Sequence, residues 1–301
     1  MSAALSIVVA ACGRTNLPDT SDSSAATNAL ATRAPFLVKV DHFYATSSDA
    51  ERHFTFFRDT LGLAVAWAYT DYGGFASGGL SAGNSVIEFV KWTVAKGEIL
   101  PTEWKAIAFE PLGGTETLVL ELARRGFKHS APDTSRYRDS AGNDVVGWTN
   151  TDLTGLSPSG TVFICDYADR KAISENRAAA KADLARRNGG PLGVIAVNEI
   201  VLEVTDVVKA AVQWRSLAGS TASESDRRFS FGDGPDIRLV GSERDGIKEI
   251  VIGVRSIAAA RRFLTDRGLL EGEDGGRVAI APRVLGGLRV TLVERDESPG
   301  T

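Results

Sequence analysis

The chain has 301 residues, of which 43% are hydrophobic and 24% charged, and its formal net charge is −4 at pH 7. This composition is typical of a soluble globular protein rather than a disordered or membrane-embedded one, and the length allows two domains that each bury a core. The slight excess of acidic residues gives no reason to expect nucleic acid as a partner, and two cysteines exclude a disulfide framework.

Residues 1–35 are predicted to be a leader and a flexible tether. A short apolar run ends at Cys12, is too short to span a bilayer, and is followed by a stretch rich in Ser, Thr, Asp and Ala. This order resembles a bacterial lipoprotein signal, which implies membrane attachment through a lipidated Cys12 and a place in the cell envelope or outside the cell. The basic residues expected before the apolar run are absent, so a disordered N-terminus of a cytoplasmic protein is the alternative.

A pattern of strand, helix and glycine recurs four times after this segment. In the first copy, an apolar strand at 39–45 precedes a capping box that begins at Ser48, and the helix that follows ends at Gly62. The third copy has its strand at 197–204, and its helix ends at Gly219. The strand, the cap and the glycine have the same spacing in both copies, which indicates one structural unit used repeatedly.

The second and fourth copies are less regular. The second has a strand at 104–110 and a helix from about 115 to 126, and the fourth has a strand at 248–254 and a helix that ends before Gly268. Further strands are predicted after the helices, at 63–69, 74–80, 85–92, 137–139, 145–148, 161–167, 278–280 and 288–293.

Pairing neighbouring copies divides the chain into two domains. The N-terminal domain is predicted at 36–168 and the C-terminal domain at 194–297, followed by a tail at 298–301. The polar, alanine-rich segment between them, 169–193, is predicted to be a linker helix that stops at a Gly-Gly-Pro turn. Its charged side chains are expected to form a solvated helix face.

Three sequence features of the first copy resemble one known superfamily. They are the strand Val40-Asp41-His42-Phe43, the helix end Phe57–Leu63, and the glycine-rich run Gly73–Gly79 followed by Ile87-Glu88-Phe89. Together with the repeat, which covers roughly residues 36–296, they resemble the vicinal-oxygen-chelate superfamily, which includes glyoxalase I, extradiol dioxygenases and bleomycin-binding proteins. The resemblance implies an α+β fold of four βαβββ modules, paired into two glyoxalase-like domains. Each domain would be a curved mixed sheet that forms a cup with helices outside.

The resemblance also implies that His42 and Glu88 stand at two metal-ligand positions inside the first cup. Alternation along the first strand places His42 and Tyr44 on one face and Asp41 on the other, and Glu88 is expected to meet His42 across the cup. An imidazole and a carboxylate suit one divalent ion such as Zn, Mn, Fe or Ni.

The second copy offers little to complete such a site. Its positions equivalent to His42 and Glu88 are Ala106 and about Ile164, and neither side chain binds a metal, whereas Asp166 lies nearby and could substitute. The predicted metal ligands are therefore His42, Glu88 and Asp166. Two alternatives remain open: a hydrogen-bonded His42–Glu88 pair that lines a metal-free pocket, and a purely structural role.

The C-terminal half replaces the ligand types altogether. Glu199 and Glu249 stand at the position of His42, and Arg238 and Thr291 stand at that of Glu88. We expect no metal centre of the family type there, and we predict an ion pair between Glu199 and Arg238 inside the second cup, because paired buried charges are tolerated better than single ones.

Three other reactive side chains are given ordinary roles. His53 is expected to be a packing or rim residue, and His129 is expected at the surface. Cys165 lies in an apolar strand and is expected to be a buried thiol.

Three functions follow from these features. In the first, a divalent ion in the N-terminal cup stabilises an oxyanionic intermediate, and Glu88 or Tyr44 is the catalytic residue beside the reacting proton; isomerase, lyase and dioxygenase reactions are all open. In the second, the cup binds a small oxygen-rich or aromatic molecule without metal or chemistry. In the third, the domains of an envelope lipoprotein serve an interaction role. The oligomeric state is not predicted.

Overall fold

The computed structural model describes residues 35–138, 141–219, 222–223 and 227–296. The predicted leader at 1–35, including Cys12, lies outside the described residues except for Pro35, and so does the tail at 298–301. None of the helices in the described ranges is both long and apolar enough to cross a membrane.

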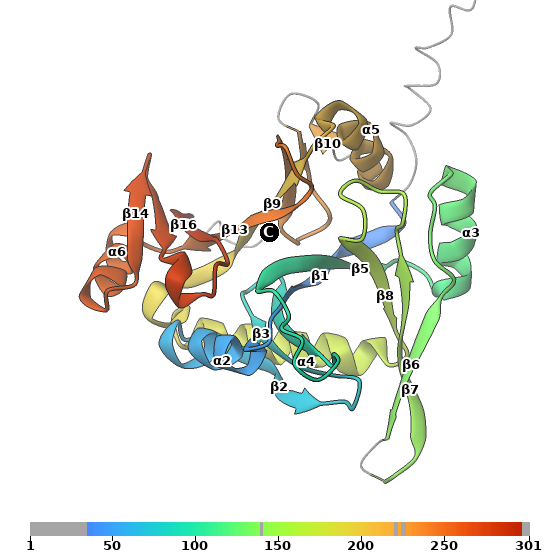
Figure 1. Ribbon diagram of the computed structural model, residues 1–301, viewed down its shortest axis with the longest axis horizontal. Helices are drawn as coiled ribbons and strands as arrows, with labels where there is room; N and C mark the ends of the chain where they lie inside the picture. Colours follow the sequence, from blue (N-terminus) through green and yellow to red (C-terminus); the bar gives the residue numbers. More distant parts are fainter. Residues whose placement is uncertain (1–34, 139–140, 220–221, 224–226, 297–301) are drawn as a thin grey trace, which may run out of the picture.

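Two eight-stranded sheets form the framework of the molecule (Figure 1). The first has the order β2-β3-β4-β1-β5-β8-β7-β6. Its strands are β1 (Leu37–Thr46), β2 (Ala64–Asp71), β3 (Phe75–Ser81), β4 (Val86–Trp92), β5 (Glu103–Pro111), β6 (Asp133–Arg138), β7 (Asp144–Asp152) and β8 (Val162–Tyr167). The helices of this half are α2 (Ala50–Thr55), which continues into a π-helical turn η1 (Phe56–Thr60), and α3 (Thr115–Arg125).

The second sheet repeats this order as β10-β11-β12-β9-β13-β16-β15-β14. Its strands are β9 (Val194–Val204), β10 (Ala222–Ser223), β11 (Arg228–Phe229), β12 (Asp236–Gly241), β13 (Gly246–Val254), β14 (Leu270–Asp274), β15 (Arg277–Ile280) and β16 (Val290–Glu294). Its helices are α5 (Val207–Ala218) and α6 (Ile257–Asp266), with a short 3-10 turn η4 (Pro282–Val284). The chain segment that connects the two sheets contains α4 (Arg170–Arg186), which packs on β2 and β3 of the first sheet, and η2 (Gly190–Leu192).

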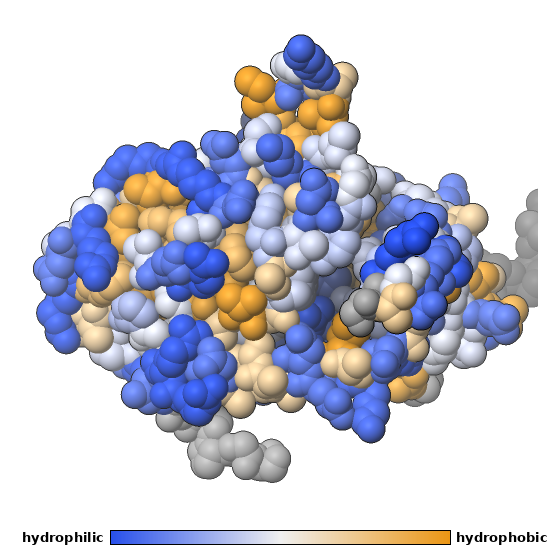
Figure 2. Space-filling model, turned by 90° about the horizontal axis from the view of Figure 1, so that it is seen from below, coloured by the Kyte–Doolittle hydropathy of each residue, from blue (hydrophilic) through white to orange (hydrophobic). Residues whose placement is uncertain are grey.

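The pairing within each sheet shows the predicted module pairs. In the first sheet, β1 is parallel to β4 and antiparallel to β5, which is itself parallel to β8. In the second sheet, β9 is parallel to β12 and antiparallel to β13, which is itself parallel to β16. The fold is therefore the predicted α+β fold with two curved, cup-shaped sheets. Seen from below, the surface is hollowed next to the β6–β7 hairpin (Figure 2).

Local signals explain where most helices begin and end. The Asp206 carboxylate accepts a hydrogen bond from the Lys209 backbone N–H at the start of α5, and the Ser256 hydroxyl accepts one from the Ala259 N–H at the start of α6. The capping box predicted at Ser48 is not formed, because the Ser48 hydroxyl hydrogen-bonds to the backbone of Leu100 instead.

The two sheets share one continuous apolar core. Phe109 on β5 lies with its ring centroid 4.7 Å from that of Phe231, and both rings contact Trp214 on α5. The Trp214 indole N–H donates a 2.7 Å hydrogen bond to the carbonyl of Ser157 in the N-terminal half. An apolar seam of this kind fixes the position of one domain on the other.

The turn between β3 and β4 adds hydrogen bonds between the two domains. The Asn84 side-chain amide donates to the carbonyls of Val197 and Asp233 and accepts from the Val197 N–H. Gly83 beside it has a φ of +92°, and a Cβ there would lie 2.0 Å from the Ile195 carbonyl oxygen, so only glycine allows this approach.

His53 lies at the same junction and is 3% exposed. A Cβ on Gly286, in the C-terminal domain, would lie 2.9 Å from the His53 ring, and Phe89 contacts the ring from the other side. The packing role predicted for His53 is thus confirmed. Burial and the neighbouring Arg52 lower the pKa of His53 below its usual value of 6.5.

We expect acid to weaken this junction through His53. Because its pKa is lowered in the folded state, the unfolded chain binds the proton more readily, and the stability present above about pH 6.5 is lost as the pH falls below it. Urea unfolding at pH 7 and at pH 5 measures the effect. Between pH 7 and pH 5, the free energy of unfolding is expected to fall by less in a His53→Gln variant than in the wild type. An equal fall in both proteins would contradict the role given to His53.

Candidate functional site

A bulge in β1 decides which side chains enter the first cup. The ladder between β1 and β5 shifts between Val40 and His42, so Asp41 is the extra residue. Val40 joins Phe43 in the core, whereas Asp41 and His42 are bonded to each other away from it. The prediction that Asp41 lies on the face opposite His42 is therefore wrong, because a bulge breaks the strict alternation of a strand.

The structure brings His42 and Glu88 together on the concave face. His42 Nε2 lies 3.5 Å from Glu88 Oε2, and His42 Nδ1 lies 2.7 Å from Asp41 Oδ2. The imidazole is 6% exposed and packs edge-on against the rings of Phe163 and Trp67, with centroids 5.6 and 6.3 Å away. The polar pair thus lies among aromatic rings.

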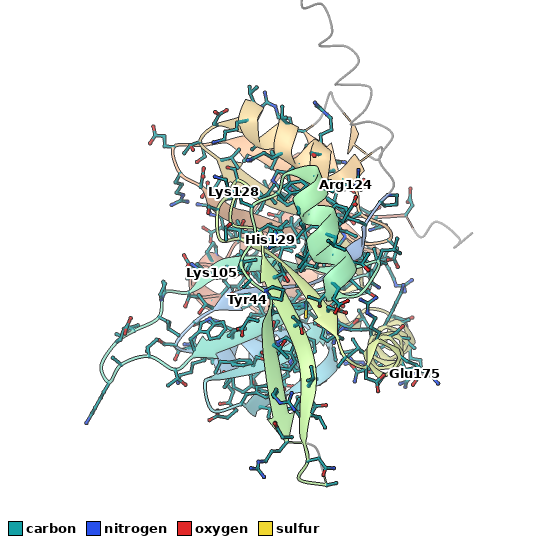
Figure 3. The ribbon with its side chains drawn as sticks, turned by 90° about the vertical axis from the view of Figure 1, so that its right-hand side faces the viewer. Tyr44, Lys105, Arg124, Lys128, His129 and Glu175 are labelled. Atoms are coloured by element: carbon teal, nitrogen blue, oxygen red, sulfur yellow. The ribbon has the colours of Figure 1, made fainter. Side chains whose placement is uncertain are left out.

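Tyr44 shares this concave face. It is paired with Glu88 in the register of β1 and β4, and its ring centroid lies 6.2 Å from that of Phe163. Figure 3 shows it behind the β6 and β7 strands. Burial, together with the charge of Glu88, raises the pKa of Tyr44 above its usual range, so its hydroxyl stays protonated and can act as a hydrogen-bond donor rather than as a base.

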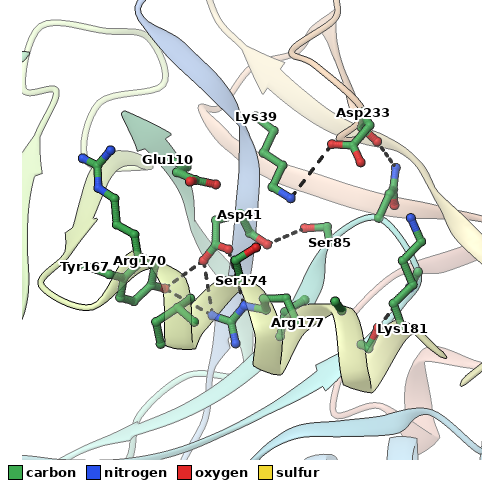
Figure 4. Close-up of a pocket in the computed structure, with 16 residues that line it drawn as sticks. Lys39, Asp41, Ser85, Glu110, Tyr167, Arg170, Ser174, Arg177, Lys181 and Asp233 are labelled. Atoms are coloured by element: carbon green, nitrogen blue, oxygen red, sulfur yellow. Dashed lines mark hydrogen bonds and ion pairs between the residues drawn. The ribbon is translucent and has the colours of Figure 1, made fainter. Parts of the chain in front are cut away.

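Asp41 is held ionised by groups from three elements. The Tyr167 hydroxyl at the end of β8 donates a 2.8 Å hydrogen bond to it, and the guanidinium of Arg177 on α4 lies 3.3 Å away (Figure 4). Burial alone would raise the pKa of Asp41, but the hydrogen bond from His42 and the charge of Arg177 outweigh it and hold the pKa well below its usual range. Burial also raises the pKa of Tyr167 well above normal, which keeps it a donor.

Arg177 closes one end of the cup. Its guanidinium lies over the Trp67 indole, 4.4 Å from the ring centroid, a favourable cation–π contact. The indole lies flat against Gly79, where a Cβ would be 2.3 Å from the ring. No pattern in the sequence indicates this role. Charged residues on a polar helix are usually solvated, so the solvated position predicted for this helix face is wrong at Arg177.

Exposed aromatic side chains surround the open end. Tyr72, which follows the end of β2, stacks on Phe75 with centroids 5.0 Å apart, and Phe75 contacts Trp92. Tyr72 also meets Trp148 of β7 edge-on at 6.4 Å, which joins the β2 edge of the sheet to the strand next to its other edge. Tyr72 and Trp92 are each about two-fifths exposed. We call these four residues the aromatic rim.

The structure does not bring Asp166 to His42 and Glu88. In the register of β5 and β8, Phe163 rather than Ile164 takes the position equivalent to Glu88, so Asp166 points to the opposite face. There it accepts hydrogen bonds from the backbone N–H and hydroxyl of Thr115 at the start of α3, and from Arg170. A register error of one residue reverses the face.

The donor set of the cup is therefore incomplete for a metal ion. His42 and Glu88 supply one nitrogen and one carboxylate, whereas the equivalent positions of the second module, Ala106 and Phe163, supply none. Catalytic zinc sites, for comparison, have three protein ligands. In the described ranges, no three His, Cys, Asp or Glu side chains are grouped to hold an ion. Cys165 nearby is 3% exposed, and burial raises the pKa of its thiol.

The second cup carries the predicted ion pair within a larger network. Arg238 Nε donates a 2.7 Å hydrogen bond to Glu199, which confirms the prediction. Arg228 also bonds to Glu199, and Thr291 and Arg277 both donate to Glu249. Four residues of the second cup stand at the positions equivalent to His42 and Glu88: Glu199, Arg238, Glu249 and Thr291. Each of them is thus hydrogen-bonded to another of the four or to a neighbouring arginine.

Comparison with known proteins supports the fold. No family model matches the chain, and no curated protein matches it. Among solved structures, a hypothetical protein from Staphylococcus aureus matches with a TM-score of 0.57 and 10% identity, over 85% of this chain and 99% of that one. An extradiol ring-cleaving dioxygenase from Brevibacterium fuscum matches with a TM-score of 0.54 and 14% identity, over 89% and 74%.

The 2,3-dioxygenase LapB from Pseudomonas sp. KL28 is similar to the same degree, with a TM-score of 0.53 and 13% identity over 89% of this chain and 96% of that one. At such low identities these likenesses show the fold and not the reaction. The chain therefore has the two-domain, vicinal-oxygen-chelate type of fold that extradiol dioxygenases share.

Proposed function

We propose that the N-terminal cup binds a small aromatic molecule that carries a hydroxyl or amine donor, and that it does so without a metal ion. The observation that carries this proposal is the placement of His42 and Glu88 among the rings of Trp67, Phe163 and Tyr44. Small-molecule sites are commonly apolar and aromatic, with a few polar groups that fix the orientation of the ligand.

Glu88 has acceptor capacity to spare for such a ligand. Its distance of 3.5 Å from His42 Nε2 is longer than an ordinary hydrogen bond. Asp41 accepts from His42 Nδ1, which orients the imidazole with Nε2 toward Glu88. A ligand hydroxyl to one side of this pair, within reach of both atoms, could donate to Glu88 while its ring lies against the aromatic walls.

The name of one structural neighbour supports an aromatic ligand. Proteins of this fold include a ring-cleaving dioxygenase, so the scaffold accommodates a ring elsewhere. The incomplete donor set around His42 is what favours binding without metal over a metal-dependent isomerase, lyase or dioxygenase.

A second candidate, proton transfer to or from the bound molecule, is favoured by one specific observation. Asp41 is ionised and hydrogen-bonded to His42 Nδ1, the arrangement that orients a histidine for general acid–base work. In that case His42 or Glu88 would be the catalytic group, and Tyr44 would be a donor to the ligand.

Removal of the Glu88 charge is expected to weaken binding of a phenol. Loss of one hydrogen bond to a charged group lowers affinity by about tenfold or more. Titration of the full chain with phenol, followed by quenching of tryptophan fluorescence, measures this in the wild type and in Glu88→Gln. Cyclohexanol, which has the hydroxyl but no aromatic ring, is expected to bind weakly.

The matched control is Glu175→Gln, because Glu175 is exposed on α4 (Figure 3) and only pairs with Lys171. Thermal unfolding shows whether both variants are folded. If Glu88→Gln and Glu175→Gln bind phenol equally well, or if cyclohexanol quenches as strongly as phenol, the proposal is wrong.

Metal content tests the other half of the proposal. Protein purified without chelator is expected to contain Zn, Mn, Fe and Ni far below one ion per chain, since two protein ligands hold an ion weakly. Elemental analysis of the wild type and of His42→Ala measures this. One ion per chain in the wild type, lost in the variant, would show that the cup is a metal centre after all.

We also propose membrane attachment through a lipidated Cys12, which is supported by the apolar run before it and the polar stretch after it. Cys12→Ala is expected to release the protein from the membrane fraction of the cells that make it. Wild-type protein found only in the cytosol would contradict this.

A further inference from the structure

A cavity of about 210 Å³ lies beside Asp41, between α4 and the N-terminal half of β1. Figure 4 shows its walls. Lys39 and Glu110 come from neighbouring positions of β1 and β5, and Lys181 comes from α4. Asp233 reaches it from the C-terminal domain. The cavity is smaller than the roughly 300–1,000 Å³ of sites for drug-sized molecules, so it suits a smaller ligand.

Part of the charge around the cavity is already neutralised. Arg177 is bonded to Asp41, and Arg170 is bonded to Asp166 and to backbone carbonyls. The ammonium of Lys39, by contrast, forms only a long ion pair with the Asp233 carboxylate, 4.0 Å away, which is too far for a hydrogen bond and can give way to a ligand. Lys181 makes no ion pair with the described residues. Two ammonium groups on opposite walls are thus available to a ligand.

Glu110 is the counterpart of these lysines. It is half-buried and, among the described residues, forms neither a hydrogen bond nor an ion pair. A half-buried carboxylate without a hydrogen-bond partner is destabilising. Burial, and then the charge of Asp41, raise the pKa of Glu110 against the opposing charges of Lys39, Arg170 and Arg177. A ligand cation beside Glu110 would remove this cost.

We propose that this cavity binds a small zwitterion of amino-acid size, with its ammonium group at Glu110 and its carboxylate between Lys39 and Lys181. The three side chains have the signs that such a ligand requires, and they surround a space of matching size. Ser85 and Ser174 at the wall add hydroxyl groups for a polar side chain. The site adjoins the aromatic cup and shares Asp41 and Arg177 with it, but the ligand contacts of Glu110, Lys39 and Lys181 do not depend on the function proposed for the cup.

The first experiment screens the twenty protein amino acids on the full chain by thermal unfolding, each at about 1 mM, where a millimolar site is half filled. At least one is expected to raise the unfolding temperature, because a ligand that binds only the folded state stabilises it. Calorimetric titration then compares the best amino acid with its deaminated acid and its decarboxylated amine, both of which are expected to bind at least about tenfold more weakly.

Variants assign the binding to the cavity. Glu110→Gln and Lys181→Met are each expected to lower the affinity by about tenfold or more. Lys171→Met is the control, since Lys171 lies on the same helix and is 86% exposed. The proposal is overturned if no amino acid shifts the unfolding temperature. It is also overturned if the deaminated acid binds as tightly as the amino acid and Glu110→Gln has no effect, which would describe a plain anion site.

Discussion

The buried carboxylate of Asp41 is the constraint on which most of the N-terminal domain depends. A carboxylate that is 5% exposed destabilises the fold unless other groups compensate its charge. Three groups do so: the imidazole of His42, the hydroxyl of Tyr167 and the guanidinium of Arg177. The β1 bulge directs Asp41 into the cup, and α4 must lie across the end of the cup to deliver Arg177. Gly79 is required in turn, because Trp67 lies against it beneath the guanidinium.

The equivalent positions of the two cups differ in how completely their side chains are paired. In the second cup, Glu199, Arg238, Glu249 and Thr291 are connected to one another, with Arg228 and Arg277 added at the edges. Each carboxylate there has partners within the protein, so the network is complete without a ligand. In the first cup, His42 and Glu88 are 3.5 Å apart and surrounded by aromatic rings, and Glu88 has acceptor capacity left. This difference is why binding is assigned to the N-terminal half.

The repeat can be recognised in the sequence because the spacing of strand, helix cap and glycine recurs. This repeat is sufficient to predict the α+β fold. It also predicts the Glu199–Arg238 pair correctly, because the bulge in β9 falls at Asn198, one residue before Glu199, and leaves Glu199 in register with β12. The position of the Asp41 side chain could not be predicted, because nothing in the amino-acid sequence of β1 indicates a bulge. Asp166 is misplaced by counting residues along its strand, since an error of one reverses the face. Arg177 escapes prediction because a polar helix gives no sign of which side chain turns inward.

The role of α4 has a consequence for how the chain can be divided. The repeat suggests a boundary after β8, but the cation that neutralises Asp41 lies beyond it, at residue 177. A fragment cut at the end of the second module would keep both modules and lose that cation. During synthesis, the first cup likewise reaches its final electrostatic state only after α4 has left the ribosome. The unit that carries the site is thus larger than the unit that is repeated.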